Sequence, residues 1–418
     1  MMRSLRSPHR RVALVFWMLA IATIPIWFSV SQPAWDASVY ARAMRWVAAG
    51  QDPYAEGVAQ EEAYYRNGPQ TGVGVPFAYV YSPLTLPLLK LASSIPAWLL
   101  KSEYWLVYAL CALAQVVVTS RAAENGERRW MELLAPAALF FPGLLVSDVI
   151  QSGNIAYILY GAALATAYLG WRRQLWLPFY VVVVAASCFK APYLSLLAIP
   201  VFSSRRQYAA ASAAAAAGVG LFAVQPWLWP VAFHNYLRAV EMQFVWNRDF
   251  GASPAGQFGA LLDQLHGPFE MASWVFYACY AVPVVGLLMV LGRRYQRGQL
   301  SLGEWMPVVL VGVILLNPRN IEYDLVPLTV PMMLVGMRLL ARFKQRSLML
   351  ALGLEHFIGV NVAVVVFLVG WWRSIDCLLV VACFAGGCWD LVKRSEPVAL
   401  PSVVPIGERG YGLHEVAS

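Results

Sequence analysis

Two long runs without a charged residue constrain this chain most. Residues 12–30 and 271–291 contain no Asp, Glu, Lys or Arg. Each run has about the length that an α-helix needs to cross roughly 30 Å of hydrocarbon at about 1.5 Å per residue. Of all residues 60% are hydrophobic and only 13% are charged, whereas a soluble chain of this length would carry more charge. The sequence therefore predicts a polytopic integral membrane protein.

The basic residues indicate how the chain is oriented. They fall in short tracts between apolar runs: Arg3/Arg6/Arg10/Arg11, Arg121/Arg128/Arg129, Arg172/Arg173, Arg205/Arg206, Arg293/Arg294/Arg297, Arg342/Lys344/Arg346 and Lys393/Arg394. Such tracts are typical of cytoplasmic connections between membrane spans. We therefore expect a cytoplasmic N-terminus, and we interpret the net charge of +8 as topology rather than as a sign of a nucleic-acid partner.

The apolar runs predict an all-α integral membrane fold of about 10–12 transmembrane helices. The expected spans are 12–30, 104–120, 131–147, 155–171, 207–226, 271–292, 304–317, 324–341, 348–370 and 375–392. Residues 76–100 contain several prolines and should form a re-entrant or broken element. Residues 174–204 should form a hairpin. Residues 1–394 then make a single membrane domain with outer loops at about 31–75 and 227–270, and residues 395–418 form a cytoplasmic tail.

Residues 12–30 have a second possible interpretation. A signal peptide could account for residues 12–30, but Ser29-Val30-Ser31-Gln32-Pro33 is a poor cleavage site.

The six cysteines lie in or beside apolar runs without a Cys-x-x-Cys or Cys/His cluster, so we expect neither disulfides nor a zinc site. No Walker A loop, His-Glu-x-x-His or Asp-x-Asp motif occurs, and we expect neither a metal ion nor a cofactor.

The first outer loop contains the strongest catalytic candidate. From residue 37 the pattern is that of an amphipathic helix lying in the membrane interface, which Gly50 ends and Asp52-Pro53-Tyr54 follows with a turn. Asp36 stands at the start of this helix. It is either an N-cap that satisfies backbone N–H groups or a general base at the membrane surface.

Two further candidates are cations. Lys190 interrupts otherwise uncharged segments, and an ionisable residue at membrane depth favours a functional role, here binding of a phosphate; the alternative is a solvated hairpin tip. Arg319 lies in Asn317-Pro318-Arg319-Asn320-Ile321-Glu322-Tyr323-Asp324. If Asn320 caps the following helix, Arg319 stands beside a positive helix end that favours an anion; the alternative is a polar turn.

Weaker candidates for substrate contact complete the set. They are Tyr40, Tyr81, Gln151, Asn154, His234, Asn320, Tyr323 and Asp324. Helix capping is an alternative for Asn154, because Gln151-Ser152-Gly153-Asn154 opens a span. Tyr81 stands in an aromatic segment that is also typical of an interfacial belt. His234 lies in a predicted interfacial helix at 229–246.

In order along the chain, several of these residues resemble a known pattern. Asp36, Tyr40 and Ala43, then Gly50, Pro53 and Tyr54, then Tyr81-Ser82-Pro83-Leu84, Gln151/Asn154 and Lys190/Pro192 are similar to short motifs of the bacterial polyprenyl-phosphate-dependent glycosyltransferases of family 87, which include mannosyltransferases. Ser82 departs from the family's Tyr-Pro-Pro-Leu segment. The resemblance covers about residues 10–340, and each motif is short.

The resemblance implies a GT-C fold in the bacterial inner membrane, with an active site at the outer face and Asp36 as its catalytic base. The expected donor is a polyprenyl-phosphate-linked sugar, mannose being the family-level expectation. The acceptor would be a glycan or glycolipid of the cell envelope. A transporter or flippase of lipid-linked substrates is the main alternative, since it also needs broken helices and charges at membrane depth, and a structural membrane protein is the third.

Overall fold

The described part of the chain folds into α-helices and short 3-10 helices, and it contains no β-strand. This computed structural model describes Met18 and residues 35–68, 75–95, 110–111, 152–245, 247–266, 269–340 and 372–393. The predicted all-α class is confirmed for these residues. Most of the spans expected at 12–30, 104–120, 131–147 and 348–370, and all of the tail at 395–418, lie outside them. The total of 10–12 spans therefore stays a prediction.

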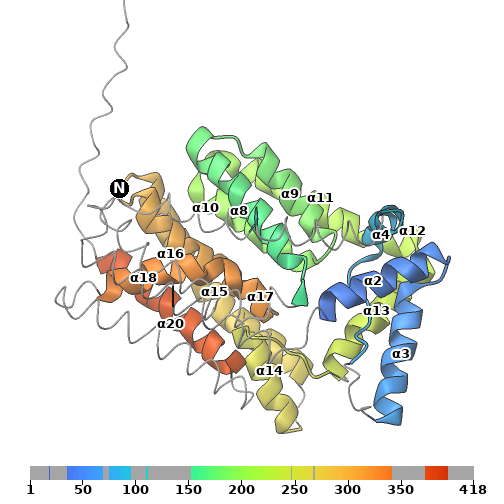
Figure 1. Cartoon of the computed structure of the whole chain (residues 1–418). Helices are drawn as coiled ribbons and strands as arrows, with labels where there is room; N and C mark the ends of the chain where they lie inside the picture. Colours follow the sequence, from blue (N-terminus) through green and yellow to red (C-terminus); the bar gives the residue numbers. More distant parts are fainter. Residues whose placement is uncertain are drawn as a thin grey trace, which may run out of the picture.

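Most helices pack into one bundle, with the 3-10 segments η4 (Ala191–Leu197), η5 (Arg205–Gln207) and η6 (Val326–Leu328) between them. Figure 1 shows this bundle in green to red. Its helices are α8 (Ala156–Arg173), α9 (Leu177–Ser187), α10 (Ala198–Ser203), α11 (Tyr208–Ala223), α14 (Pro254–Gln264), α15 (Phe269–Gln296), α16 (Leu302–Leu315), α17 (Glu322–Leu325), α18 (Thr329–Leu340) and α20 (Trp372–Lys393).

Three helical stretches of the described residues are long and apolar enough to cross a membrane: Arg205–Leu228, Ala272–Gln296 and Arg373–Lys393. They match the spans expected at 207–226, 271–292 and 375–392. Four shorter apolar helices, Leu177–Ser187, Ala191–Ser203, Leu302–Leu315 and Thr329–Leu339, accompany them. These findings are those of a helical membrane protein.

The bundle is apolar on its outside as well as in its core. α16 lies at the centre, and Trp305, Val309 and Val313 on it are completely buried. Large apolar side chains are exposed on α9, α11, α15 and α20, for example Leu177, Val219, Val282 and Leu378. A helix bundle that shows aliphatic side chains outward is suited to lipid rather than to water.

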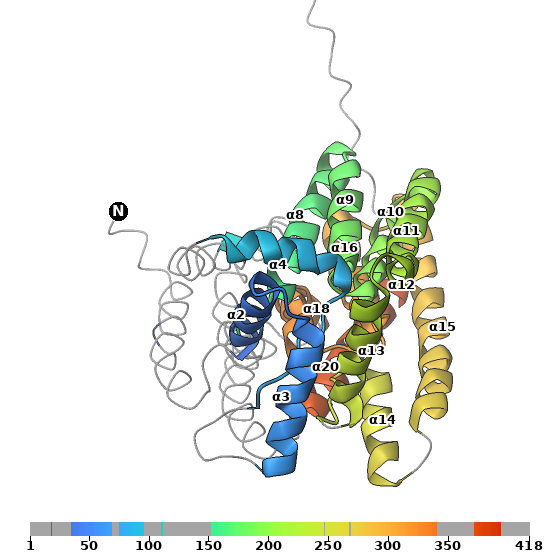
Figure 2. The ribbon, with the colours of Figure 1, turned by 90° about the vertical axis from the view of Figure 1, so that its right-hand side faces the viewer.

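A second group of helices covers one end of the bundle, and we call it the outer layer (Figure 2). It consists of α2 (Trp35–Ala48), α3 (Pro53–Asn67), α4 (Leu86–Ser93) and α13 (Pro230–Val245). η2 (Pro83–Thr85) leads into α4, and α12 (Gln225–Leu228) joins α11 to α13. The two outer loops expected at 31–75 and 227–270 thus contain helices, as predicted for α2 and α13. Within the outer layer α3 packs on both α2 and α13. The helices α3 and α14 in these loops were not expected.

Polar side chains join α3 to α13 within the outer layer. Asp52 caps α3 by accepting from the N–H groups of Tyr54 and Ala55, and its second oxygen accepts from Asn235 on α13 at 2.8 Å. Glu62 of α3 also pairs with Arg238 of α13, at 2.7 Å. These contacts fix the two outer loops against each other, although about 180 residues separate them in sequence.

Interhelical hydrogen bonds bring several basic tracts to the same end of the bundle. Trp171 of α8 donates to Ser203 of α10, Gln296 of α15 donates to the carbonyl of Phe202, and Arg294 donates to carbonyls at the end of α20. We call this the basic end; its cations are Arg172, Arg173, Arg205, Arg206, Arg293, Arg294, Arg297 and Lys393. The outer layer covers the opposite end, so the two ends of the bundle differ in charge as the positive-inside pattern requires.

The two segments that fitted poorly as spans are irregular in the structure. Residues 75–82 have no regular secondary structure and lead into η2 and α4, which agrees with the broken element predicted at 76–100. α9 and η4 pack against each other with Lys190 between them, which agrees with the hairpin predicted at 174–204.

Candidate functional site

Asp36 lies where the outer layer meets the bundle. It is the second residue of α2, an amphipathic helix that buries Val39 and Ala43 and ends before Gly50, whose φ is +72°. The side-chain amide of Asn154 donates to Asp36 Oδ2 over 2.9 Å. Asn154 lies two positions before the first residue of α8, so this hydrogen bond joins the first outer helix to the start of a bundle helix. Figure 1 shows the starts of α2 and α8 close together near α17.

Asn154 has two roles at once. Its Oδ1 accepts from the N–H of Ala156 at 2.8 Å, which caps the start of α8, while its Nδ2 donates to Asp36. Gly153 beside it has φ +66°, a conformation that glycine adopts without strain. The structure therefore shows the hydrogen bond at the start of α8, and the substrate contact of Asn154 stays a prediction. Gln151, its predicted companion, lies outside the described residues.

Tyr81 connects the hydrogen-bonded pair of Asp36 and Asn154 to Lys190. It is 4% exposed. Its hydroxyl lies 2.7 Å from that of Tyr40 and 3.4 Å from Asn154 Nδ2. The backbone carbonyl of Tyr81 accepts from the hydroxyl of Tyr54 at 2.7 Å. The tyrosine is thus held at both its backbone and its side chain, and it belongs to the site as well as to an aromatic cluster.

Lys190 lies on the other side of the Tyr81 ring. Its ammonium nitrogen is 5.5 Å from the centre of that ring and 4.7 Å from the centre of the Tyr323 ring, and it donates to the Tyr323 hydroxyl at 3.4 Å. Cation–π contacts of this kind stabilise an ammonium that has lost part of its water. No carboxylate of the described residues forms an ion pair with Lys190, although Asp324 and Asp36 are near enough to attract it.

The main chain before Lys190 is fixed to the Tyr81 segment. The hydroxyl of Ser82 donates to the carbonyl oxygen of Cys188, and the rings of Tyr81 and Phe189 pack edge to face with their centres 6.2 Å apart. Ser82 therefore links the segment that carries Tyr81 to the main chain just before Lys190.

Arg319 is engaged by a carboxylate. Its guanidinium donates to Asp249 Oδ2 at 3.0 Å and to the Asp249 backbone carbonyl at 3.0 Å, and Arg373 lies 2.8 Å from Asp249 Oδ1. Asp249 thus joins the loop after α13 to the start of α20 and to the segment after α16. A phosphate bound by Arg319 would have to share it with Asp249, whereas Lys190 has no such competitor within ion-pair distance among the described residues.

The predicted capping role of Asn320 is wrong. Asn320 Nδ2 donates back to the carbonyl of Ile314 in α16 at 3.0 Å, and Asp324 accepts from the N–H of Ile321 at 3.0 Å. α17 has only four residues, which is too short for the positive helix end that was expected beside Arg319. Asn320 and Asp324 are nevertheless buried close to Lys190 and Arg319, at 1% and 3% exposure.

Burial raises the pKa of Asp36 to about 6, and the hydrogen bond from Asn154 and the positive charge of Lys190 limit this rise. A carboxylate desolvated in this way binds a proton more tightly than one in water. A general base is most effective when its pKa lies near the working pH. Asp36 is therefore largely ionised at pH 7 and yet a stronger base than an exposed aspartate.

His234 does not join the site. It is exposed on α13 and makes no hydrogen bond or ion pair with a described residue. The site instead includes Tyr193, whose hydroxyl is buried without a hydrogen-bond partner among the described residues and which lies near Tyr81 and Tyr323. Tyr193 follows Lys190 by three positions, and this proximity in sequence was the available signal for it.

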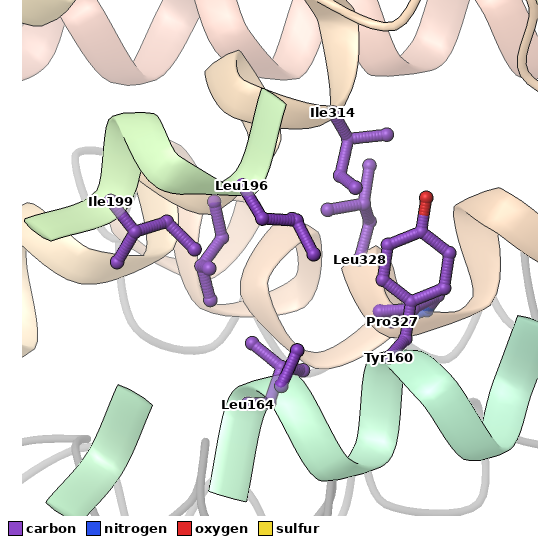
Figure 3. Close-up of a pocket in the computed structure, with 9 residues that line it drawn as sticks. Tyr160, Leu164, Leu196, Ile199, Ile314, Pro327 and Leu328 are labelled. Carbon is purple, nitrogen blue, oxygen red and sulfur yellow. The ribbon is translucent and has the colours of Figure 1, made fainter. Parts of the chain in front are cut away.

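A small apolar cavity lies beneath the site (Figure 3). It measures about 10 Å³ and is lined mainly by aliphatic side chains of α8, α10, α16 and neighbouring segments, with the Tyr160 ring at one end. The Tyr160 and Tyr193 ring centres are 4.9 Å apart. A space of this size holds at most about one water, so this cavity does not accommodate a sugar.

Two further observations bear on the chemistry. All six cysteines are free, and no group of three His, Cys, Asp or Glu side chains in the described ranges is arranged to hold a metal ion.

No protein-family model, no curated protein and no solved structure matches this chain.

Proposed function

We propose that this chain is an inverting membrane glycosyltransferase of GT-C type. The observation that carries the proposal is that Tyr81 stands between a carboxylate and an ammonium. Its hydroxyl approaches the Asn154 amide that holds Asp36, and its ring lies beneath Lys190. These four residues come from four separate stretches of sequence, and they combine a carboxylate with an ammonium at the end of the bundle that the outer layer covers.

In the proposed reaction Asp36 takes the proton of an acceptor hydroxyl. The resulting oxygen nucleophile attacks the anomeric carbon of the donor sugar from the side opposite the phosphate, and the bond from that carbon to the phosphate oxygen breaks. The bonding electron pair leaves with the polyprenyl monophosphate. Lys190 stabilises the negative charge that develops on this leaving group, and Arg319, which is paired with Asp249, adds a second positive charge near it.

The substrates and the location follow from the resemblance to the family 87 enzymes. We propose a polyprenyl-phosphate-linked sugar as the donor, with mannose as the first sugar to test. The proposed acceptor is a cell-envelope glycan or glycolipid. The collection of arginines at the basic end supports a cytoplasmic position for that end. The outer layer with Asp36 then faces the periplasmic side of a bacterial inner membrane.

The test is a transfer assay on the purified chain with labelled polyprenyl-phosphate mannose and a glycolipid extract as acceptor. Asp36→Asn should lower the rate by about 10²- to 10⁴-fold, the range for loss of a general base. Asp263→Asn is the matched control, because Asp263 forms its ion pair with Arg248 outside the site. Turnover by Asp36→Asn at the control's rate would refute the role of Asp36.

The same preparation separates the enzyme from a transporter. In proteoliposomes, a flippase would move the labelled lipid between leaflets without forming a glycosylated product, whereas an enzyme forms product in detergent as well. Movement of intact donor together with no product in any preparation would favour the transporter. Thermal unfolding of each variant shows whether it is folded.

A further inference from the structure

At the basic end, a cavity of about 400 Å³ opens between the end of α10 and the last turns of α15. Four arginines line it, together with two serines and a glutamine: Arg205, Arg206, Arg293, Arg297, Ser203, Ser204 and Gln296. The cavity lies at the opposite end of the bundle from Asp36 and has no part in the proposed transfer reaction.

The four arginines of this cavity lack carboxylate partners among the described residues. Arg205, Arg206, Arg293 and Arg297 take part in no ion pair there. By contrast, Arg66, Arg238, Arg248, Arg319 and Arg373, which lie in the outer layer or near the site, each pair with an Asp or Glu. Like charges gathered around one cavity repel each other, and a bound anion would relieve that repulsion.

The two walls of the cavity are held at a fixed distance. Gln296 Nε2 donates to the carbonyl of Phe202 at 3.2 Å. A Cβ atom at Gly292 would lie 2.8 Å from that same carbonyl oxygen, so only glycine allows α15 to approach α10 this closely. Ser203 accepts from the indole N–H of Trp171 at 3.0 Å. The arginines are therefore mounted on backbones that are fixed before any ligand binds.

The cavity also lies at the level of a membrane surface. One membrane-length helix, Arg205–Leu228, begins at it and another, Ala272–Gln296, ends at it. On α15, Val290 and Arg293 are three residues apart and so share one face, and Val290 is 45% exposed. Arg297 directly follows the helix, and its N–H donates to the carbonyl of Arg293. An acyl chain along Val290 and a headgroup phosphate at the arginines would follow this face.

We propose that this cavity binds a phosphate group, and that the anion comes from a lipid headgroup. Guanidinium groups suit phosphate because several N–H donors can contact its oxygens at once. Basic pockets between membrane helices are known to receive anionic headgroups. A soluble phosphate compound carries the same chemistry, and the experiment distinguishes the two sources.

The experiment measures thermal unfolding of the full chain in a neutral detergent. The added probes are dioleoyl phosphatidylglycerol, dioleoyl phosphatidylcholine and inorganic phosphate, each titrated separately. The test variant replaces Arg206, Arg293 and Arg297 by Gln. The matched control replaces Arg45, Arg66 and Lys90 by Gln, which removes the same charge from exposed positions of the outer layer and leaves the Glu62–Arg238 pair in place.

Phosphatidylglycerol should raise the melting temperature of the wild type and of the control at similar concentrations. The test variant should bind it about 100-fold more weakly, since each basic residue near an anionic lipid contributes about a factor of five. An equal rise with inorganic phosphate, lost in the same variant, supports the phosphate site in the cavity but overturns the lipid headgroup as its source. A rise of the same size and midpoint in the test variant, or no rise with either anion, overturns the proposal.

Discussion

The side-chain amide of Asn154 donates a 2.9 Å hydrogen bond to the carboxylate of Asp36, across 118 positions of sequence. Through its other atom the same amide caps α8. The position of the proposed base is therefore tied to the start of a bundle helix, and the orientation of its carboxylate does not depend on α2 alone. Positioning of this kind is what a base near a reacting hydroxyl requires.

The transfer rate should depend on the ionisation of Asp36. Because burial raises its pKa to about 6, the base is protonated and inactive below that pH. The value of kcat/KM should rise about tenfold per pH unit below pH 6 and level off above about pH 7. A pH profile between 4.5 and 8.5 measures this. A rate that stays level down to pH 4.5 would contradict the assignment.

Asp36→Asn should also be more stable than the wild type at neutral pH. The pKa of Asp36 is higher in the folded chain, about 6, than its ordinary value of 3.8, so folding binds a proton between these values and stability falls as pH rises through this window. The cost at pH 7.5 is at most about 3 kcal/mol, and partial exposure reduces it. The melting temperature of the variant should exceed that of the wild type at pH 7.5, and the difference should shrink toward pH 4. The opposite trend with pH would show that the carboxylate is not destabilised by burial.

Asn154→Ala should shift the pH profile. Removing the amide takes away a donor that favours the charged carboxylate, so the pKa of Asp36 rises further and the rate at pH 7 falls. Asn235→Ala is the control, because Asn235 makes the same kind of amide–carboxylate bond, to Asp52 at 2.8 Å. Both variants should lose some stability, but only Asn154→Ala should move the midpoint of the rate profile upward. A common midpoint for both would mean that Asn154 is only a helix cap.

Lys190→Gln should lower kcat by about 10²- to 10³-fold, the range for loss of one group that stabilises a developing negative charge. Lys190→Arg keeps the charge near Tyr81 and Tyr323 and should recover part of the rate. Lys90→Gln is the control on α4, since Lys90 is exposed there. If Lys190→Gln and Lys190→Arg are equally impaired while both remain folded, Lys190 contributes its shape and packing rather than its charge.

Gly251→Ala should destabilise the loop that holds Arg319. Gly251 has φ +80°, and a Cβ atom there would lie 2.4 Å from the carbonyl oxygen of Asn320. Gly50→Ala is the matched control, because Gly50 has φ +72° with no atom within 4 Å of an added Cβ. The control should lose about 1 kcal/mol from backbone conformation alone, and Gly251→Ala clearly more, with a lower melting temperature and slower transfer. Equal melting temperatures for the two variants would show that the loop yields to the added methyl group.

The sequence alone determined those features that depend on local pattern. Apolar runs predicted the helices that became α11, α15 and α20, because burying backbone groups in an apolar medium requires a helix. The amphipathic pattern after Asp36 predicted α2, and the prolines within residues 76–100 predicted an irregular segment. The positions of Asp36 and Lys190 as isolated charges were visible for the same reason, since a charge is costly where its neighbours are apolar.

Only the tertiary structure decided which side chains meet. The contact of Asn154 with Asp36 and the pairing of Arg319 with Asp249 join residues 118 and 70 positions apart, and no period of three or four residues encodes such pairs. The same limit explains the error on Asn320, whose amide turns back to α16 instead of forward to α17, and the exposure of His234. Hydrogen-bond partners depend on how helices pack, and packing sums many weak contacts over the whole chain, whereas helix formation is decided within a few turns.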